Sequence, residues 1–117
     1  MRKIYYLSTC STCKRILGEL PEIDTFTLQD IKKDPITEGD LKVMYDKVGS
    51  YEKLINKRAQ LYKERDLKNK ELSEEAFKQL LLEHYTFLSR PVILIDEEVY
   101  VGNSKKVIEE AISYIKK

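Results

Sequence analysis

A short apolar run leads directly into a pair of closely spaced cysteines, and this order limits the folds that the chain can adopt. Ile4–Leu7 is uniformly apolar, as expected for a strand in the middle of a sheet. A polar turn with Cys10 and Cys13 follows, and then a helical pattern that extends to about Leu20. Asp24–Leu28 alternates polar and apolar residues and predicts a second strand. The chain therefore opens as a βαβ unit with a right-handed crossover.

The middle of the chain is predicted to be helical. Residues 37–40 have the form of a capping box that begins at Thr37, and Ser73 is placed to begin a later helix. The expected helices cover residues 41–48, 50–55 and 74–84, and the charged residues 63–70 form a connection between them.

The last third of the chain returns to strands. Residues 91–95 form an apolar strand, residues 96–98 a turn, and residues 99–101 a strand that pairs back as a hairpin. Ser104 then caps a final amphipathic helix. The predicted fold is thus α/β, in the order βαβ, helical insert, ββα, as one domain over residues 1–117. Its core covers about 1–30 and 88–117, and its insert about 31–87.

Composition excludes several classes of protein. The 117 residues suit a single domain, and 21 basic against 20 acidic residues give a net charge of +1. No global basic field therefore points to direct binding of nucleic acid. No apolar run approaches the ~20 residues that cross a bilayer, and the apolar stretch near the N-terminus is too short for a signal peptide. We expect a monomeric, cytoplasmic protein.

The cysteine pair carries the chemistry that the sequence predicts. Cys10 lies where a helix begins, and the unpaired N–H groups and positive dipole there favour a thiolate. Ser11 or Thr12 is expected to cap this helix, and Lys14 adds positive charge. Cys13 lies one turn into the helix, close enough to form a disulfide with Cys10 or to resolve a mixed disulfide. The alternative is two buried structural cysteines. A zinc site is not expected, because the chain has one histidine and no second cysteine pair.

Two arginines are candidates for the same site. Arg90 precedes Pro91 at the start of the apolar strand, and Arg58 lies in the helical insert. Guanidinium groups beside a thiolate would hold it ionised and would also bind a tetrahedral oxyanion. The alternative for both arginines is an ordinary surface position.

Together these motifs resemble those of the ArsC (arsenate reductase) and Spx family. The resemblance covers essentially the whole chain. It rests on the ordered segments Ile4–Lys14, Leu54–Lys63 and Phe87–Ile93, followed by Val101-Gly102 before the last helix. It implies a thioredoxin-like fold with an all-helical insert of about 50 residues, and a cis peptide bond before Pro91.

The resemblance also implies roles for individual residues. In the glutathione-coupled arsenate reductases the cysteine that matches Cys10 attacks arsenate. Arg90 matches one of their three oxyanion-binding arginines, a second falls at Asn56, and a third has no counterpart. Arg58 and Cys13 match residues of the Spx-like branch, so the chain is closer to that branch. The candidates for substrate contact are Ser11, Thr12, Lys14, Pro91 and Asn56.

Two functions follow from this set of residues. The first is a thiol-dependent oxidoreductase, in which Cys10 attacks arsenate, another small oxyanion or a disulfide, and Cys13 resolves the adduct. It needs no bound cofactor, and its reductant would be glutathione with glutaredoxin, or a thioredoxin system. The second is a redox-switch regulator of the Spx type that binds RNA polymerase. A non-enzymatic binding module is disfavoured by the intact cysteine, arginine and proline set.

Overall fold

The computed structural model describes residues 1–117 and separates them into two compact units. The first unit joins Met1–Asp34 to Arg90–Lys117, and the second is the intervening segment Pro35–Ser89. The hydrophobic pattern changes from strands to helices close to these boundaries. The description of the whole chain as one domain stays a prediction.

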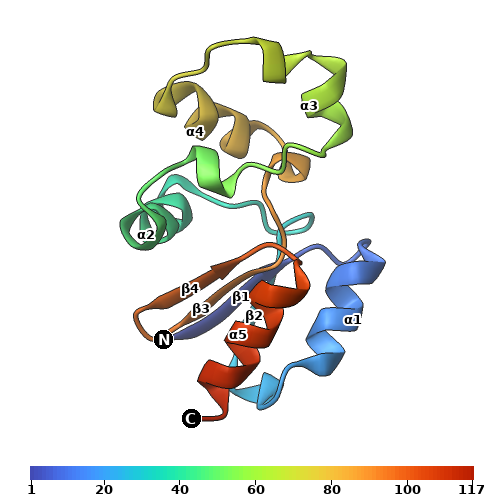
Figure 1. Cartoon of the computed structure of the whole chain (residues 1–117), viewed down its shortest axis with the longest axis vertical. Helices are drawn as coiled ribbons and strands as arrows, with labels where there is room; N and C mark the ends of the chain where they lie inside the picture. The colour runs from blue at the N-terminus through green and yellow to red at the C-terminus, as the bar shows by residue number, and fades with distance from the viewer. The chain divides into compact units, whose positions relative to one another are not determined.

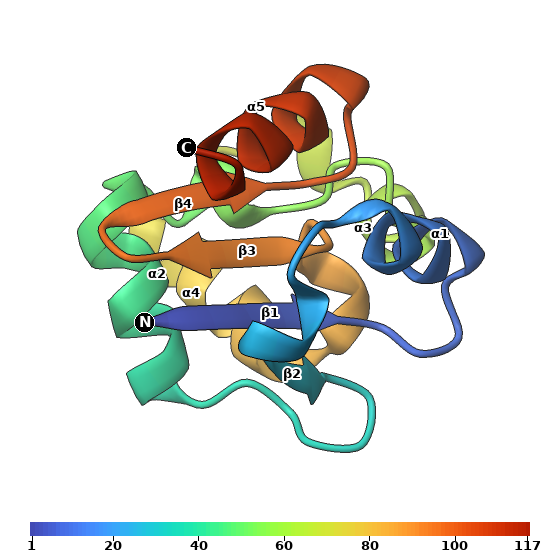
Figure 2. The same cartoon turned by 90° about the horizontal axis from the view of Figure 1, so that it is seen from below.

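A four-stranded sheet forms the centre of the first unit (Figures 1 and 2). Its strands are β1 (Arg2–Tyr6), β2 (Thr27–Asp30), β3 (Val92–Ile95) and β4 (Glu98–Val101), in the order β2-β1-β3-β4. β1 is parallel to β2 and antiparallel to β3, and β3 is antiparallel to β4. The predicted parallel pair and the closing hairpin are therefore confirmed. All four residues of β3 are buried, which explains its uniformly apolar sequence.

Helices α1 (Ser11–Glu19) and α5 (Lys105–Ile115) cover one face of this sheet (Figure 1). Their apolar residues recur at helical spacing and join those of the strands in one core. This core contains Ile4, Ile16, Leu20, Phe26, Ile93, Ile95, Ile108, Ala111 and Ile115. Ser104 caps α5 as predicted, because its hydroxyl accepts a hydrogen bond from the N–H of Val107 at 3.2 Å.

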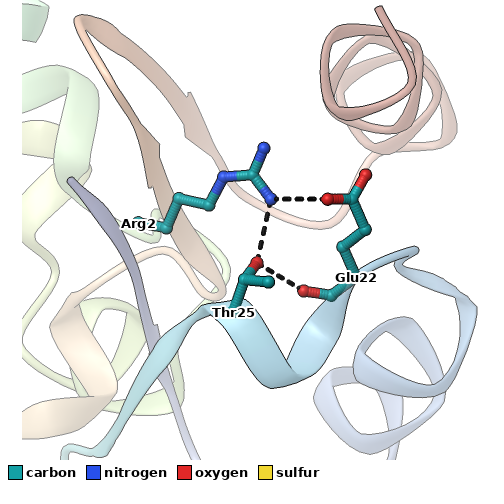
Figure 3. Close-up of polar contacts among 3 residues, drawn as sticks. All are labelled: Arg2, Glu22 and Thr25. Atoms are coloured by element: carbon teal, nitrogen blue, oxygen red, sulfur yellow. Dashed lines mark hydrogen bonds and ion pairs between the residues drawn. The ribbon is translucent and has the colours of Figure 1, made fainter.

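The segment between α1 and β2 differs from the prediction. The start of the strand expected at Asp24–Leu28 is instead the 3-10 helix η1 (Ile23–Thr25), and β2 begins after it. Arg2 holds this turn: its Nη1 donates to Glu22 Oε1 at 3.2 Å and to Thr25 Oγ1 at 2.8 Å (Figure 3). The Thr25 hydroxyl donates to the Glu22 carbonyl at 2.6 Å. These contacts satisfy polar groups at the turn, so the strand starts later than the alternation suggested.

The second unit is helical, as predicted. It contains α2 (Glu38–Val48), α3 (Gln60–Glu64) and α4 (Glu74–Glu83), with the 3-10 helices η2 (Glu52–Leu54), η3 (Leu67–Asn69) and η4 (Tyr85–Phe87). The capping box is confirmed: the Thr37 hydroxyl accepts from Asp40 N–H at 3.1 Å, and Thr37 N–H donates to the Asp40 carboxylate at 2.9 Å. Ser73 caps α4 by accepting from Ala76 N–H at 3.1 Å. None of the helices is long and apolar enough to cross a bilayer.

The charged stretch 63–70 was wrongly predicted to be a connection. α3 extends into it, and η3 lies within it. The stretch is solvated as its charge suggested, since residues 63–66 and 68–70 are exposed, and Leu67 is its one buried side chain.

The short helix predicted over residues 50–55 is reduced to η2. Ile55 pairs with Leu88 in an isolated antiparallel bridge, and the Leu54 carbonyl accepts from Ser89 N–H at 2.8 Å. The backbone therefore changes to an extended conformation, which ends the helical turn.

Candidate cysteine redox site

Cys10 is itself the N-cap residue of α1. Its φ of −97° and ψ of 112° are extended, and its N–H donates to the Leu7 carbonyl at 3.0 Å. The prediction that Ser11 or Thr12 caps the helix was wrong. The helix begins one residue earlier, because the Cys10 carbonyl already accepts the first helical hydrogen bond, from Lys14 N–H at 3.1 Å.

The surroundings of Cys10 favour its thiolate. Burial raises the pKa of the Cys10 thiol, but four other influences outweigh it and leave that pKa below its ordinary value. The backbone N–H and the thiol of Cys13 donate toward the Cys10 sulfur, and the positive charge of Arg90 acts in the same direction. The backbone N–H of Thr12 contributes as well. The first turn of α1 has no acidic residue to oppose them.

Cys13 has the opposite properties. It is fully buried one turn into α1, and this burial raises the pKa of its thiol to about 11. The neighbouring Cys10 also raises the pKa, while the Leu7 backbone and the charge of Arg90 lower it. Both cysteines are free thiols. The site thus combines a half-buried sulfur that ionises easily with a buried sulfur that keeps its proton at neutral pH.

Arg90 and Pro91 precede β3 in the same unit as the cysteines. The peptide bond between them is cis, as the resemblance implied. Pro91 is buried, and its carbonyl accepts from Gly102 N–H at 3.0 Å. The charge of Arg90 acts on both Cys10 and Cys13, so the fold brings this guanidinium within electrostatic range of the cysteine pair.

The other predicted site residues fall into two groups. Ser11, Thr12 and Lys14 lie in the first turn of α1, where Ser11 and Lys14 are exposed and Thr12 is half-buried. Asn56 and Arg58 belong to the second unit, in a local turn where Arg58 N–H donates to Asn56 Oδ1 at 3.1 Å. The roles of all five in substrate contact or catalysis stay predictions.

Residues that the sequence did not single out also build the site. The Leu7 backbone contacts both cysteines, and Asp30 at the end of β2 accepts from Ser8 N–H at 3.2 Å. The predicted parallel pairing of β1 and β2 could have indicated Asp30, since the carboxyl ends of parallel strands lie at the same edge of a sheet.

This arrangement suits attack by sulfur. A partly exposed thiol with a lowered pKa, within electrostatic range of a guanidinium, is suited to act as a nucleophile, and a second thiol one helical turn away can attack the resulting adduct. The guanidinium can also bind a tetrahedral anion. No three His, Cys, Asp or Glu side chains are grouped so that they could hold a metal ion.

Known proteins resemble this chain over nearly its whole length. The Global transcriptional regulator Spx 2 of Bacillus anthracis is 26% identical over 111 residues, which cover 92% of this chain and 83% of that protein. An ArsC family related protein from Bacteroides fragilis has a TM-score of 0.78 at 26% identity, covering 94% of this chain and 97% of that one. An arsenate reductase from Vibrio cholerae has a TM-score of 0.76 at 20% identity, covering 96% and 95%, which shows a shared fold alone.

These similarities confirm the predicted thioredoxin-like α/β fold. The sequence pattern of the ArsC family matches residues 5–111. The pair Cys10 and Cys13 is the feature that the resemblance assigned to the Spx-like branch. The chain therefore belongs to the ArsC family and, by its second cysteine, to the Spx-like side of it.

Proposed function

We propose that this protein is a thiol-dependent oxidoreductase in which Cys10 attacks the substrate and Cys13 resolves the adduct. The observation that carries the proposal is the contrast between the two thiols, with the pKa of Cys10 lowered and that of Cys13 raised to about 11. At neutral pH this contrast selects Cys10 as the attacking sulfur, because the thiolate and not the thiol is the nucleophile.

With a disulfide substrate, the first step exchanges one sulfur–sulfur bond for another. The Cys10 thiolate bonds to one substrate sulfur, the substrate disulfide breaks, and the second substrate sulfur leaves as a thiolate. No net oxidation has occurred at this stage, and Cys10 is held in a mixed disulfide.

The second step uses Cys13. The neighbouring Cys10 sulfur contributes to the raised pKa of Cys13 as a hydrogen-bond acceptor and as a negative charge. Both contributions end when Cys10 becomes part of a disulfide, so the Cys13 proton is released more easily at that moment. The Cys13 thiolate then attacks the Cys10 sulfur, the remaining substrate thiolate leaves, and a Cys10–Cys13 disulfide forms. Two electrons have passed from the cysteines to the substrate.

An oxyanion substrate would follow the same order. With arsenate, Cys10 bonds to arsenic as a hydroxyl leaves as water, and attack by Cys13 on Cys10 then releases arsenic in its trivalent form. Arg90, which lies in the same unit as the cysteines, would stabilise the anion. An external dithiol, from a glutaredoxin or a thioredoxin system, would reduce the disulfide again.

The test counts thiols released from a chromogenic aromatic disulfide. The wild-type protein should release two aromatic thiols per protein molecule and finish with a Cys10–Cys13 disulfide. Cys13→Ser should release one aromatic thiol and keep the other bound to Cys10, which mass spectrometry detects as an adduct. Cys10→Ser should release none at neutral pH. Equal stoichiometry in the wild type and Cys13→Ser would contradict the division of roles. A second assay supplies arsenate together with each reductant system and measures the trivalent arsenic that forms. Its result shows whether arsenate is a substrate.

A second candidate is a redox switch that binds RNA polymerase. The relative named Global transcriptional regulator Spx 2 and the paired cysteines favour it. In this function the Cys10–Cys13 disulfide changes affinity for the polymerase rather than turning over substrate. Purified RNA polymerase should then bind the oxidised and the reduced protein with different affinity. Absence of binding in both states would remove this candidate.

A further inference from the structure

Asp30 occupies the end of β2 beside the strand that leads to the cysteines. In the parallel pair it lies opposite Tyr6, the last residue of β1, and Ile31 N–H donates to the Tyr6 carbonyl at 2.9 Å. The carboxyl ends of both strands therefore meet where the cysteine loop begins.

The Asp30 carboxylate reaches across this edge to the loop. Its Oδ1 accepts from Ser8 N–H at 3.2 Å and from Lys32 N–H at 3.2 Å. A hydrogen bond from the Ser8 side chain is the largest cause of a lowered pKa at Asp30, so the group is ionised at neutral pH. Its Oδ2 is shielded from solvent and has no hydrogen-bond partner. A local turn would use only Lys32, whereas Ser8 lies 22 positions away in the chain.

Leu7 connects Ser8 to the two sulfurs. Its carbonyl accepts from Cys10 N–H at 3.0 Å, and its backbone hydrogen-bonds to the Cys13 thiol. The position of the Leu7-Ser8 segment therefore fixes the backbone of Cys10 and one partner of Cys13 at the same time.

We propose that Asp30 is a positioning residue for the redox site, which holds the Leu7-Ser8 segment through Ser8 and thereby sets the geometry of both thiols. This role of Asp30 rests on the proposed function, since the position of the thiols matters only if they react. Asp30 touches neither the substrate nor the reacting sulfurs in this role.

A positional role and a purely electrostatic role for Asp30 predict changes of opposite direction in the rate at which Cys10 reacts. A carboxylate acting only through its charge would disfavour the nearby thiolate, so removing it would speed attack by Cys10. A carboxylate acting through position should slow that attack when it is removed or displaced.

The experiment measures alkylation of Cys10 by iodoacetamide across pH, with folding checked by circular dichroism. Asp30→Asn keeps an oxygen acceptor for Ser8 N–H and should stay within about twofold of wild type. Asp30→Glu keeps the charge but displaces it by a methylene, and Asp30→Ala removes it; both should be slower by about fivefold, the loss of one hydrogen bond. Asp34→Ala, an exposed carboxylate of the following turn, is the matched control and should not change the rate.

The proposal is supported if Cys10 is alkylated faster in Asp30→Asn than in Asp30→Glu, and at close to the wild-type rate in Asp30→Asn. Any other order overturns it, including Asp30→Glu at the wild-type rate or above. These two variants decide the question even if Asp30→Ala does not fold. Alkylation needs no substrate, so absence of turnover by the wild type would count against the proposed function while leaving this ranking readable.

Discussion

The start of α1 differs from the starts of three other helices, α2, α4 and α5. α2, α4 and α5 each begin with a hydroxyl side chain, from Thr37, Ser73 and Ser104, which accepts a hydrogen bond from a backbone N–H of the first turn. α1 begins with Cys10, and no side-chain oxygen caps its first turn. In these three helices a side-chain oxygen accepts from the first turn, α3 begins at Ala59 without a side-chain cap, and α1 presents its first N–H groups to a sulfur.

A hydroxyl and a sulfur at the start of a helix have different effects on stability and on reactivity. A hydroxyl cap contributes ~1 kcal/mol by satisfying unpaired N–H groups. A sulfur at the same position gains less stability but becomes easier to ionise, because the N–H groups and the helix dipole favour its negative charge. The first unit therefore lacks one hydroxyl cap and has at that position a thiol whose pKa is lowered.

The largest effect is expected from giving α1 a hydroxyl cap like those of α2, α4 and α5. Cys10→Ser places a good cap at the same position, so the free energy of unfolding should rise by ~0.5 kcal/mol. Alkylation at neutral pH should fall by at least ~100-fold, because the remaining thiol is buried and holds its proton. Mass spectrometry and urea unfolding measure the two quantities. Rapid alkylation of the remaining Cys13 would refute the contrast between the thiols.

The second prediction concerns the buried thiol at alkaline pH. Folding raises the pKa of Cys13 from 9.0 to about 11. Its stabilisation is therefore complete below the unfolded pKa and is lost as the pH rises through the folded pKa. At ~1.4 kcal/mol per unit, the free energy of unfolding should fall by about 2–3 kcal/mol over that window.

The control for this prediction is Cys13→Ala, followed over the same pH range. Tyrosine and lysine titrations are common to both proteins, so the difference between the two curves reports the titration of Cys13 together with the change that its loss causes at Cys10. Parallel curves would show that the thiol is not perturbed by folding.

A smaller effect is expected from Arg90. Arg90→Met removes a positive charge that lowers the pKa of Cys10, so that pKa should rise. Alkylation at neutral pH should slow by about tenfold, the cost of one charge-assisted interaction. Arg15→Met, which removes an exposed arginine of α1 that pairs with Glu19 at 4.0 Å, is the matched control. An equal loss in both variants would make the effect of Arg90 non-specific.

The smallest effects should come from the conventional caps. Thr37→Ala, Ser73→Ala and Ser104→Ala should each lower the free energy of unfolding by ~1 kcal/mol. The alkylation rate of Cys10 should be unchanged in all three. A cap substitution that altered this rate would show that helix starts other than that of α1 influence the thiolate.

Local patterns predicted most of the fold. The apolar residues of β3 and the caps at Thr37, Ser73 and Ser104 lie in sequences whose neighbours determine their structure. The start of β2 was placed too early, because it depends on Arg2, whose bond to Thr25 spans 23 positions. No local pattern contains that contact.

The site divides in the same way. Cys10 and Cys13 could be recognised from their spacing and from the helix that follows. Asp30 could not, since its bond to Ser8 depends on the register of two strands separated by a helix. The cap was misassigned because Ser11 and Thr12 are better cap residues than cysteine, and preference alone does not reveal that the helix starts at a sulfur.

The most direct test is a titration of the two thiols by NMR, with cysteine labelled at Cβ and Cys13→Ser used to assign the signals. Cys10 should ionise below the pKa of a free cysteine, and Cys13 should ionise near 11. A Cys10 thiol that ionises at or above the pKa of free cysteine would contradict the claim that the start of α1 is built to hold a thiolate.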